Sequence, residues 1–98
     1  MGEKNIMIKA TIIWVRESEG GKRIIPEINE KYYPIFKIKG HDEIFSWSFV
    51  VVNLEKTSDL TTVAQVYFLM DDAPSNVLVK NLEFSLFEGR LVAEGKIH

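Results

Sequence analysis

Residues 84–97 read FSLFEGRLVAEGKI, and this stretch decides the fold class. Two largely apolar runs, residues 84–87 and 90–93, flank Glu88 and Gly89. A short connection between antiparallel strands needs a residue with positive φ, and glycine adopts that conformation without steric strain. The stretch therefore predicts a β-hairpin that turns at Gly89.

The rest of the chain repeats this kind of pattern. Apolar and polar residues alternate with a period of two in most segments, and the others are rich in β-branched and aromatic residues, which favour strands. The strand-like segments are residues 6–15, 33–39, 45–52, 62–70, 77–79, 82–87 and 90–97. Residues 53–60 are predicted to form a loop, because the helix-like window 54–63 is short and rich in threonine. Six or seven short strands predict an all-β domain, a small barrel or a sandwich.

Length and composition predict one domain, residues 1–98, with 46% apolar residues to fill its core. There are no cysteines, which excludes disulfides, thiolate metal ligands and cysteine nucleophiles and fits a reducing compartment. The N-terminal residues lack the apolar segment of a signal peptide, and no apolar run approaches the roughly 20 residues of a membrane span. We therefore expect a cytoplasmic protein without a membrane partner.

Charge is divided unevenly along the chain, although the net charge is only −2. Residues 1–41 hold eight Lys and Arg against five Glu, a balance of +3, whereas residues 42–98 hold four against nine acidic residues, a balance of −5. Such a split is compatible with a basic face, but strands from both halves interleave in a β-fold and can disperse it.

The glycine pair Gly20-Gly21 precedes two cations, Lys22 and Arg23, and invites comparison with a phosphate-binding loop. Such a loop needs a longer glycine spacing between a strand and a helix, and neither is present. Two interpretations remain. The run is a turn between strands, or it is a basic loop that touches a phosphate backbone through Lys22 and Arg23.

Metal and catalytic chemistry have little support in the sequence. His41 and His98 are isolated, and a bound metal needs several ligands and a fixed outer shell. Asp71 and Asp72, with Asn76, could supply oxygen ligands from a loop, but a solvated loop is the simpler interpretation. No serine lies in a nucleophile-elbow motif. We therefore expect no enzyme activity, no cofactor and no metal site.

Three motifs, in order and at similar spacing, resemble the C-terminal β-barrel domain (domain 3) of elongation factor Tu and related translation factors. Residues 8–13, IKATII, followed by EGGKR at 19–23 and by Pro26, are similar to its opening strand and E-G-G-R-x-x-P loop. Residues 32–36, YYPIF, are similar to its Y-R-P-x-F strand. Residues 84–97 resemble its closing hairpin, F-x-x-R-E-G-G-R-T-V-G-x-G-x-[VI], with one glycine fewer. The resemblance implies a six-stranded antiparallel Greek-key β-barrel.

The resemblance also implies a partner. In these factors the domain contacts the acceptor arm of transfer RNA through the first loop, the Y-R-P strand and the closing hairpin, and GTP hydrolysis belongs to another domain. An RNA-binding module of this kind would use the cations that the chain retains, Lys22, Arg23, Lys37 and Arg90.

Three positions depart from the family pattern. Tyr33 stands where the family has an arginine, Ile35 where it has a polar residue, and Phe87 where it has the arginine before the hairpin glutamate. Loss of cations weakens RNA binding, whereas apolar side chains at surface positions are typical of protein interfaces. We therefore expect a stand-alone, non-catalytic binding module that binds a protein partner or forms a homo-oligomer through Tyr33, Ile35 and Phe87. RNA binding is the alternative.

Overall fold

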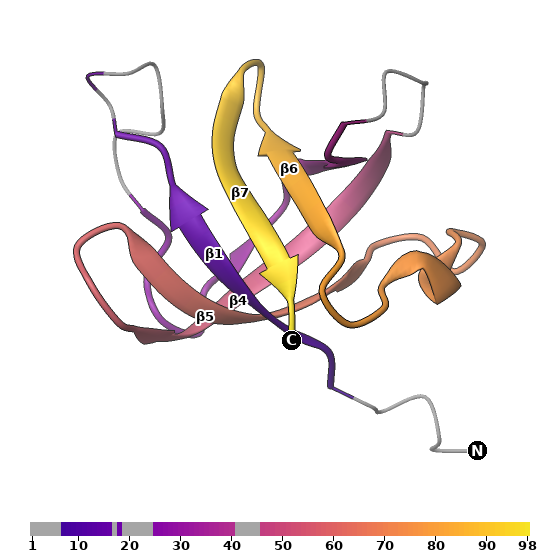
Figure 1. Ribbon diagram of the computed structural model, residues 1–98, viewed down its shortest axis with the longest axis horizontal. Helices are drawn as coiled ribbons and strands as arrows, with labels where there is room; N and C mark the ends of the chain where they lie inside the picture. The colour runs from indigo at the N-terminus through magenta and orange to yellow at the C-terminus, as the bar shows by residue number, and fades with distance from the viewer. Residues whose placement is uncertain (1–6, 17, 19–24, 41–45) are drawn as a thin grey trace.

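The computed structural model describes residues 7–16, 18, 25–40 and 46–98, and it consists almost entirely of β-strands and their connections (Figure 1). The elements in chain order are β1 (Lys9–Trp14), β2 (Lys31–Tyr32), β3 (Ile35–Ile38), β4 (Trp47–Lys56), β5 (Thr61–Phe68), the 3-10 turn η3 (Ser75–Val77), β6 (Glu83–Phe87) and β7 (Leu91–Ile97). All strand pairings are antiparallel.

The strands close into a barrel whose ring order is β3, β6, β7, β1, β5 and β4, with β4 also paired to β3. β2 and β3 pair with β4 in one register on either side of Tyr33 and Pro34, so together they form one strand interrupted at a proline. The predicted six-stranded antiparallel barrel is confirmed. The order is that of a Greek key, because β1 lies beside β5 and β7 and not beside β2. Figure 1 shows β7 and β6 toward the viewer, with β4 and β5 passing behind them.

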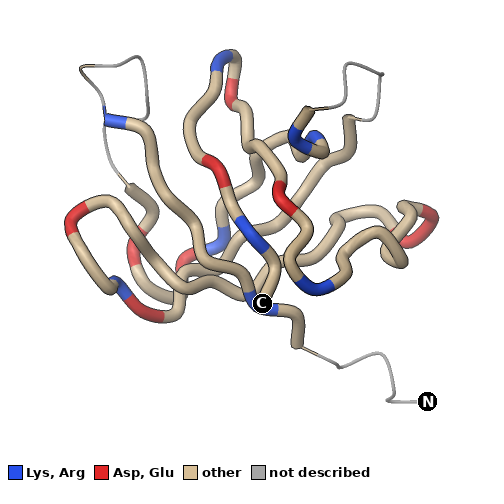
Figure 2. Tube along the Cα trace, viewed as in Figure 1, with Lys and Arg blue, Asp and Glu red and all other residues tan. Residues whose placement is uncertain are grey.

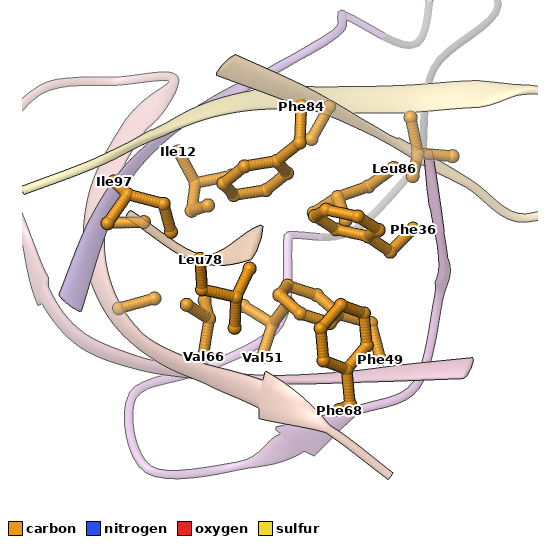
Figure 3. Close-up of a cluster of buried hydrophobic side chains, with 14 of the residues drawn as sticks. Ile12, Phe36, Phe49, Val51, Val66, Phe68, Leu78, Phe84, Leu86 and Ile97 are labelled. Atoms are coloured by element: carbon orange, nitrogen blue, oxygen red, sulfur yellow. The ribbon is translucent and has the colours of Figure 1, made fainter. Parts of the chain in front are cut away.

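The interior is filled by every second side chain of the strands, as period-two alternation requires. At its centre four fully or almost fully buried rings, Phe36, Phe49, Phe68 and Phe84, come together from β3, β4, β5 and β6 (Figure 3). Their contacting pairs have ring centroids 4.7 to 5.6 Å apart in tilted or edge-on arrangements. Because the core draws one ring from each of four strands, it holds the closed barrel together.

The predicted hairpin is confirmed, with residues 88–90 joining β6 to β7. Gly89 has a φ of +76°, the left-handed conformation expected of it. A register shift between Leu86 and Phe87 gives β7 one extra residue, and both Val92 and Ala93 are buried as a result.

Two local predictions are wrong. Residues 77–79 do not form a strand, because Val77 ends the 3-10 turn and the connection is anchored through buried Leu78. The loop predicted at residues 53–60 is shorter, since β4 continues to Lys56. Asn53, which marked the start of that loop, is fully buried in the strand and hydrogen-bonded there.

Candidate functional site

The interrupted strand β2–β3 presents alternate residues to the outside of the barrel. Tyr32 and Phe36 are on its inward side and pack against the core. Between and beyond them Tyr33 is 56% exposed and Ile35 is 37% exposed. Lys37 continues this outward series after Phe36. Two of the predicted partner-binding residues and one predicted RNA-binding residue therefore lie on one side of one strand.

Phe87, the third predicted partner-binding residue, lies directly opposite Ile35 across the β3–β6 pairing. It is half-buried, and the Lys37 Nζ lies 4.9 Å from the centroid of its ring. A cation at this distance over an aromatic face is attracted by the ring's negative potential. The structure thus brings Ile35, Phe87 and Lys37 into one cluster, although they belong to different predicted sites.

This surface continues across β4 to the end of β5. Ser48 lies opposite Ile35, and the backbone N–H of Leu69 donates to the Ser48 carbonyl at 3.0 Å. Leu69 is 48% exposed. Phe87, Ile35, Ser48 and Leu69 therefore form one row that crosses four neighbouring strands.

A second row runs beside the first. The shared register of β2 and β3 places Tyr33 opposite Val50, and Val50 pairs with Tyr67 of β5. Val50 does not belong to the core cluster, yet it is only 1% exposed. We name the two rows together the outer apolar face: Tyr33, Ile35, Val50, Tyr67, Leu69 and Phe87.

The sequence argument missed Val50, Tyr67 and Leu69. One signal for them exists, because residues 49–52 are apolar at every position. An uninterrupted apolar run is typical of a strand that is covered on both sides, and the interior of a barrel covers only one. The signal therefore points to a second apolar contact outside the barrel.

Arg90 lies at the tip of the hairpin, beside a contact that ties the hairpin to β2. The Tyr32 hydroxyl donates to the Glu88 carboxylate, and the Tyr32 ring packs on Trp14 with centroids 5.8 Å apart. Burial raises the pKa of Tyr32 well above its usual range, and the hydrogen bond to Glu88 and its charge add to this, while the charge of Arg90 opposes it. Arg90 thus lies within a structural contact.

Replacing Tyr32 with phenylalanine tests this contact. The hydrogen bond to Glu88 is lost while the ring is kept, so the free energy of unfolding should fall by about 1 kcal/mol at neutral pH. Because the folded state raises the pKa of Tyr32, its stabilisation is complete below the unfolded value of about 10 and is lost as the pH rises above it. As the pH rises above ~10, the free energy of unfolding measured with urea should therefore fall less for Tyr32→Phe than for the wild type. Identical pH profiles for the two proteins would refute this role, and Tyr33→Phe is the control on an exposed ring.

The other predicted cations, Lys22 and Arg23, lie outside the described residues. Along the described part of the chain, basic and acidic residues are interspersed (Figure 2). Of the predicted RNA-binding set, Lys37 and Arg90 both lie near the β6–β7 hairpin, one over Phe87 and one at the tip.

A shallow groove of about 680 Å³ lies on the opposite side of the barrel, along β1 and β7. Five of its polar side chains contact one another. Lys39 Nζ is 3.3 Å from a Glu94 oxygen and 3.8 Å from a Glu83 oxygen, and Thr11 Oγ1 is 2.8 Å from His98 Nε2. The described residues contain no group of three or more His, Cys, Asp or Glu side chains that could hold a metal ion. Paired, open groups of this kind stabilise a sheet surface, and the outer apolar face is the stronger candidate site.

Within the described ranges, no helix has the length and apolar character that a membrane crossing requires. No protein-family model matches the chain, and no curated protein sequence matches it either. The arguments about function that follow therefore depend on the geometry of the outer apolar face.

Proposed function

We propose that this chain is a non-catalytic β-barrel module that binds a protein partner, or another copy of itself, through the outer apolar face. The observation that carries the proposal is the exposure of Tyr33, Ile35 and Leu69, 56%, 37% and 48%, on the two sides of β4 on one surface. Removing such apolar side chains from water is a favourable contribution to association. Contiguous exposed apolar surface on a small domain commonly marks an interaction site.

The proposal includes a distant relation to the C-terminal barrel domain of elongation factor Tu. Its support is the closed barrel with Greek-key order and the placement of two of the similar motifs. Residues 32–36 and the start of the closing hairpin lie on neighbouring strands, where Ile35 faces Phe87. A cytoplasmic location completes the proposal, in keeping with the cysteine-free sequence.

The double variant Tyr33→Ser/Ile35→Ser tests the proposed function. It removes one aromatic and one aliphatic side chain from the centre of the face. Association should fall at least about tenfold, because central apolar groups dominate interface energies. The measurements are sedimentation velocity for self-association and quantitative mass spectrometry of proteins captured from a soluble extract.

Ile13→Ser is the matched control, since Ile13 is 56% exposed at an outward position of β1, between Thr61 and Glu94. This variant should behave as the wild type in both measurements, and thermal unfolding should show all three proteins folded. If the double variant self-associates and captures proteins from the extract as well as the control does, the outer apolar face is not a binding surface.

RNA binding is the second candidate function, and the placement of Lys37 over the ring of Phe87 favours it. Proteins bind single-stranded nucleic acids with cations that contact the phosphates and with aromatic rings on which the bases stack. A filter-binding titration decides between the candidates. Retention of RNA at low salt that declines steeply with added salt and is lost in Lys37→Ala would favour RNA, and no retention at low salt would eliminate it.

A further inference from the structure

The interrupted strand β2–β3 carries a lysine at each end of its exposed apolar pair. Lys31 comes two residues before Tyr33, and Lys37 comes two residues after Ile35, so all four follow one another on the outward side of the strand. Because β2 and β3 pair with β4 in one register, the strand is continuous, and the backbones of the two lysines are about 20 Å apart. We name Lys31, Tyr33, Ile35 and Lys37 the β2–β3 strip.

The neighbouring strands place an uncharged residue opposite each of the two lysines. Lys31 lies opposite Val52 of β4, and Lys37 lies opposite Ser85 of β6. Neither lysine forms an ion pair with another residue of the described ranges. No carboxylate of those ranges therefore neutralises either charge at contact distance.

Lys39 shows that carboxylates are available to lysines elsewhere on this sheet. It lies two residues beyond Lys37, and its Nζ is 3.8 Å from a Glu83 oxygen and 3.3 Å from a Glu94 oxygen. The lysine just outside the strip is thus paired within the barrel, whereas the two lysines of the strip keep their charges available to a partner.

The part of the strip between its lysines is apolar, and so are its neighbours. Tyr33 and Ile35 are exposed. The shared register of β2 and β3 places Val50 opposite Tyr33, and Phe87 lies opposite Ile35. The strip therefore presents an apolar centre with one positive charge at each end.

We infer that the partner of the outer apolar face is a protein segment whose apolar side chains are bracketed by carboxylates, and that it lies along the β2–β3 strip. Its apolar side chains cover Tyr33 and Ile35, and its carboxylates pair with Lys31 and Lys37. This inference rests on the proposed function, because it names the chemistry of the partner for the same surface.

The centre of the strip favours a protein over a nucleic acid as the source of the negative charge. The side chain of Ile35 can neither stack on a base nor donate a hydrogen bond to a phosphate, and its burial is favourable only against apolar atoms. The lysines then decide the sign of the charges beside those atoms, since cations placed there would be repelled. Apolar side chains bracketed by Asp or Glu satisfy both requirements.

Selection from a phage-displayed peptide library against the full chain tests the inference. Random peptides of about 16 residues span the strip even when they are helical. Those enriched on the wild type should carry Asp or Glu on both sides of apolar residues. Lys31→Glu/Lys37→Glu should enrich Lys or Arg at those positions instead, because the complementary charge is reversed. In fluorescence anisotropy, an acidic peptide selected on the wild type should bind this variant at least about tenfold more weakly.

Lys80→Glu/Lys96→Glu is the matched control, because both lysines line the groove along β1 and β7. It should enrich acidic peptides and bind them as the wild type does, and thermal unfolding should show both charge variants folded. The inference is overturned if the wild type enriches basic peptides, uncharged peptides or none. It is also overturned if the reversed variant enriches the same acidic peptides as the wild type.

Two other occupants would give different results. RNA retention that is lost in Lys37→Ala would assign the lysine to a phosphate, and self-association that is lost in Lys31→Glu/Lys37→Glu would assign the strip to a second copy. Either result overturns the inference. The proposed function fails separately, when Tyr33→Ser/Ile35→Ser loses neither self-association nor captured protein. Peptides of another charge that still require Tyr33 and Ile35 would leave the proposed function standing.

Discussion

Replacing Gly95 with alanine is expected to lower the free energy of unfolding by about 3 kcal/mol or more, a large part of the stability of a small domain. A Cβ at this position would lie 2.4 Å from Cζ of Phe84 and 2.9 Å from Cδ1 of Ile12. Both side chains are fully buried. The Phe84 ring cannot move aside without cost, because it packs against both Phe36 and Phe49 at centroid distances of 5.3 and 5.6 Å.

Urea unfolding followed by tryptophan fluorescence measures this effect, and two further variants isolate its cause. Gly89 has a positive φ, but nothing lies within 4 Å of a Cβ added there. Gly89→Ala should therefore lower the free energy of unfolding by only about 1 kcal/mol, through backbone strain. Phe84→Leu shortens the obstructing ring, so Gly95→Ala should cost at least about 1 kcal/mol less in that background. If Gly95→Ala were as stable as Gly89→Ala, the close approach of Phe84 would not limit this position.

The fold was accessible from the sequence because its signals are local. The alternation along residues 32–38 places Tyr33 and Ile35 on one side of the strand and Phe36 on the other, and the turn at Gly89 depends only on the positive φ of that glycine. As predicted, Tyr33 is exposed and Phe36 is buried. Periodicity along one strand thus determines which side chains face out.

The extent of the candidate site was not accessible, because it depends on the register between strands. Val50 and Tyr67 join Tyr33 only through the β2–β4–β5 pairings, and one residue of slip would turn them inward. Leu69 joins the face just beyond the end of β5, and strand propensity does not predict which residues lie beside it there. The residue pattern along one strand does not predict which residues of the neighbouring strands lie beside it.

Asn53 shows the same limit for the barrel interior. A polar residue after an apolar run is typical of a turn, but here its Nδ2 donates to the Pro26 carbonyl at 2.8 Å and its Oδ1 accepts from the Thr62 hydroxyl at 2.8 Å. The Thr62 hydroxyl in turn accepts from Trp14 Nε1 at 3.0 Å. The partners come from three other segments, so burial of this amide is decided by tertiary structure alone.

Asn53→Ala is accordingly expected to lower the free energy of unfolding by about 3 kcal/mol. The substitution removes two buried hydrogen bonds and leaves the Pro26 carbonyl and the Thr62 hydroxyl without these partners in the closed end of the barrel. Asn76→Ala, on the exposed turn η3, is the control and should change stability by less than about 0.5 kcal/mol.

A double-mutant cycle with Thr62→Val separates the hydrogen-bond chain from simple loss of volume. Because Thr62 and Asn53 belong to one network, Asn53→Ala should cost about 1 kcal/mol less when Thr62 is already valine. Strict additivity of the two substitutions would mean that the amide only fills space. A coupled result would show that the hydrogen bond between Asn53 and Thr62 itself stabilises the barrel. Asn53 also contacts the β1–β2 connection twice, since its Nδ2 donates to the Pro26 carbonyl at 2.8 Å and its own carbonyl accepts the Asn29 N–H at 2.7 Å. That connection leads directly into β2 and Tyr33, so these hydrogen bonds link the barrel interior to the strand that begins the outer apolar face.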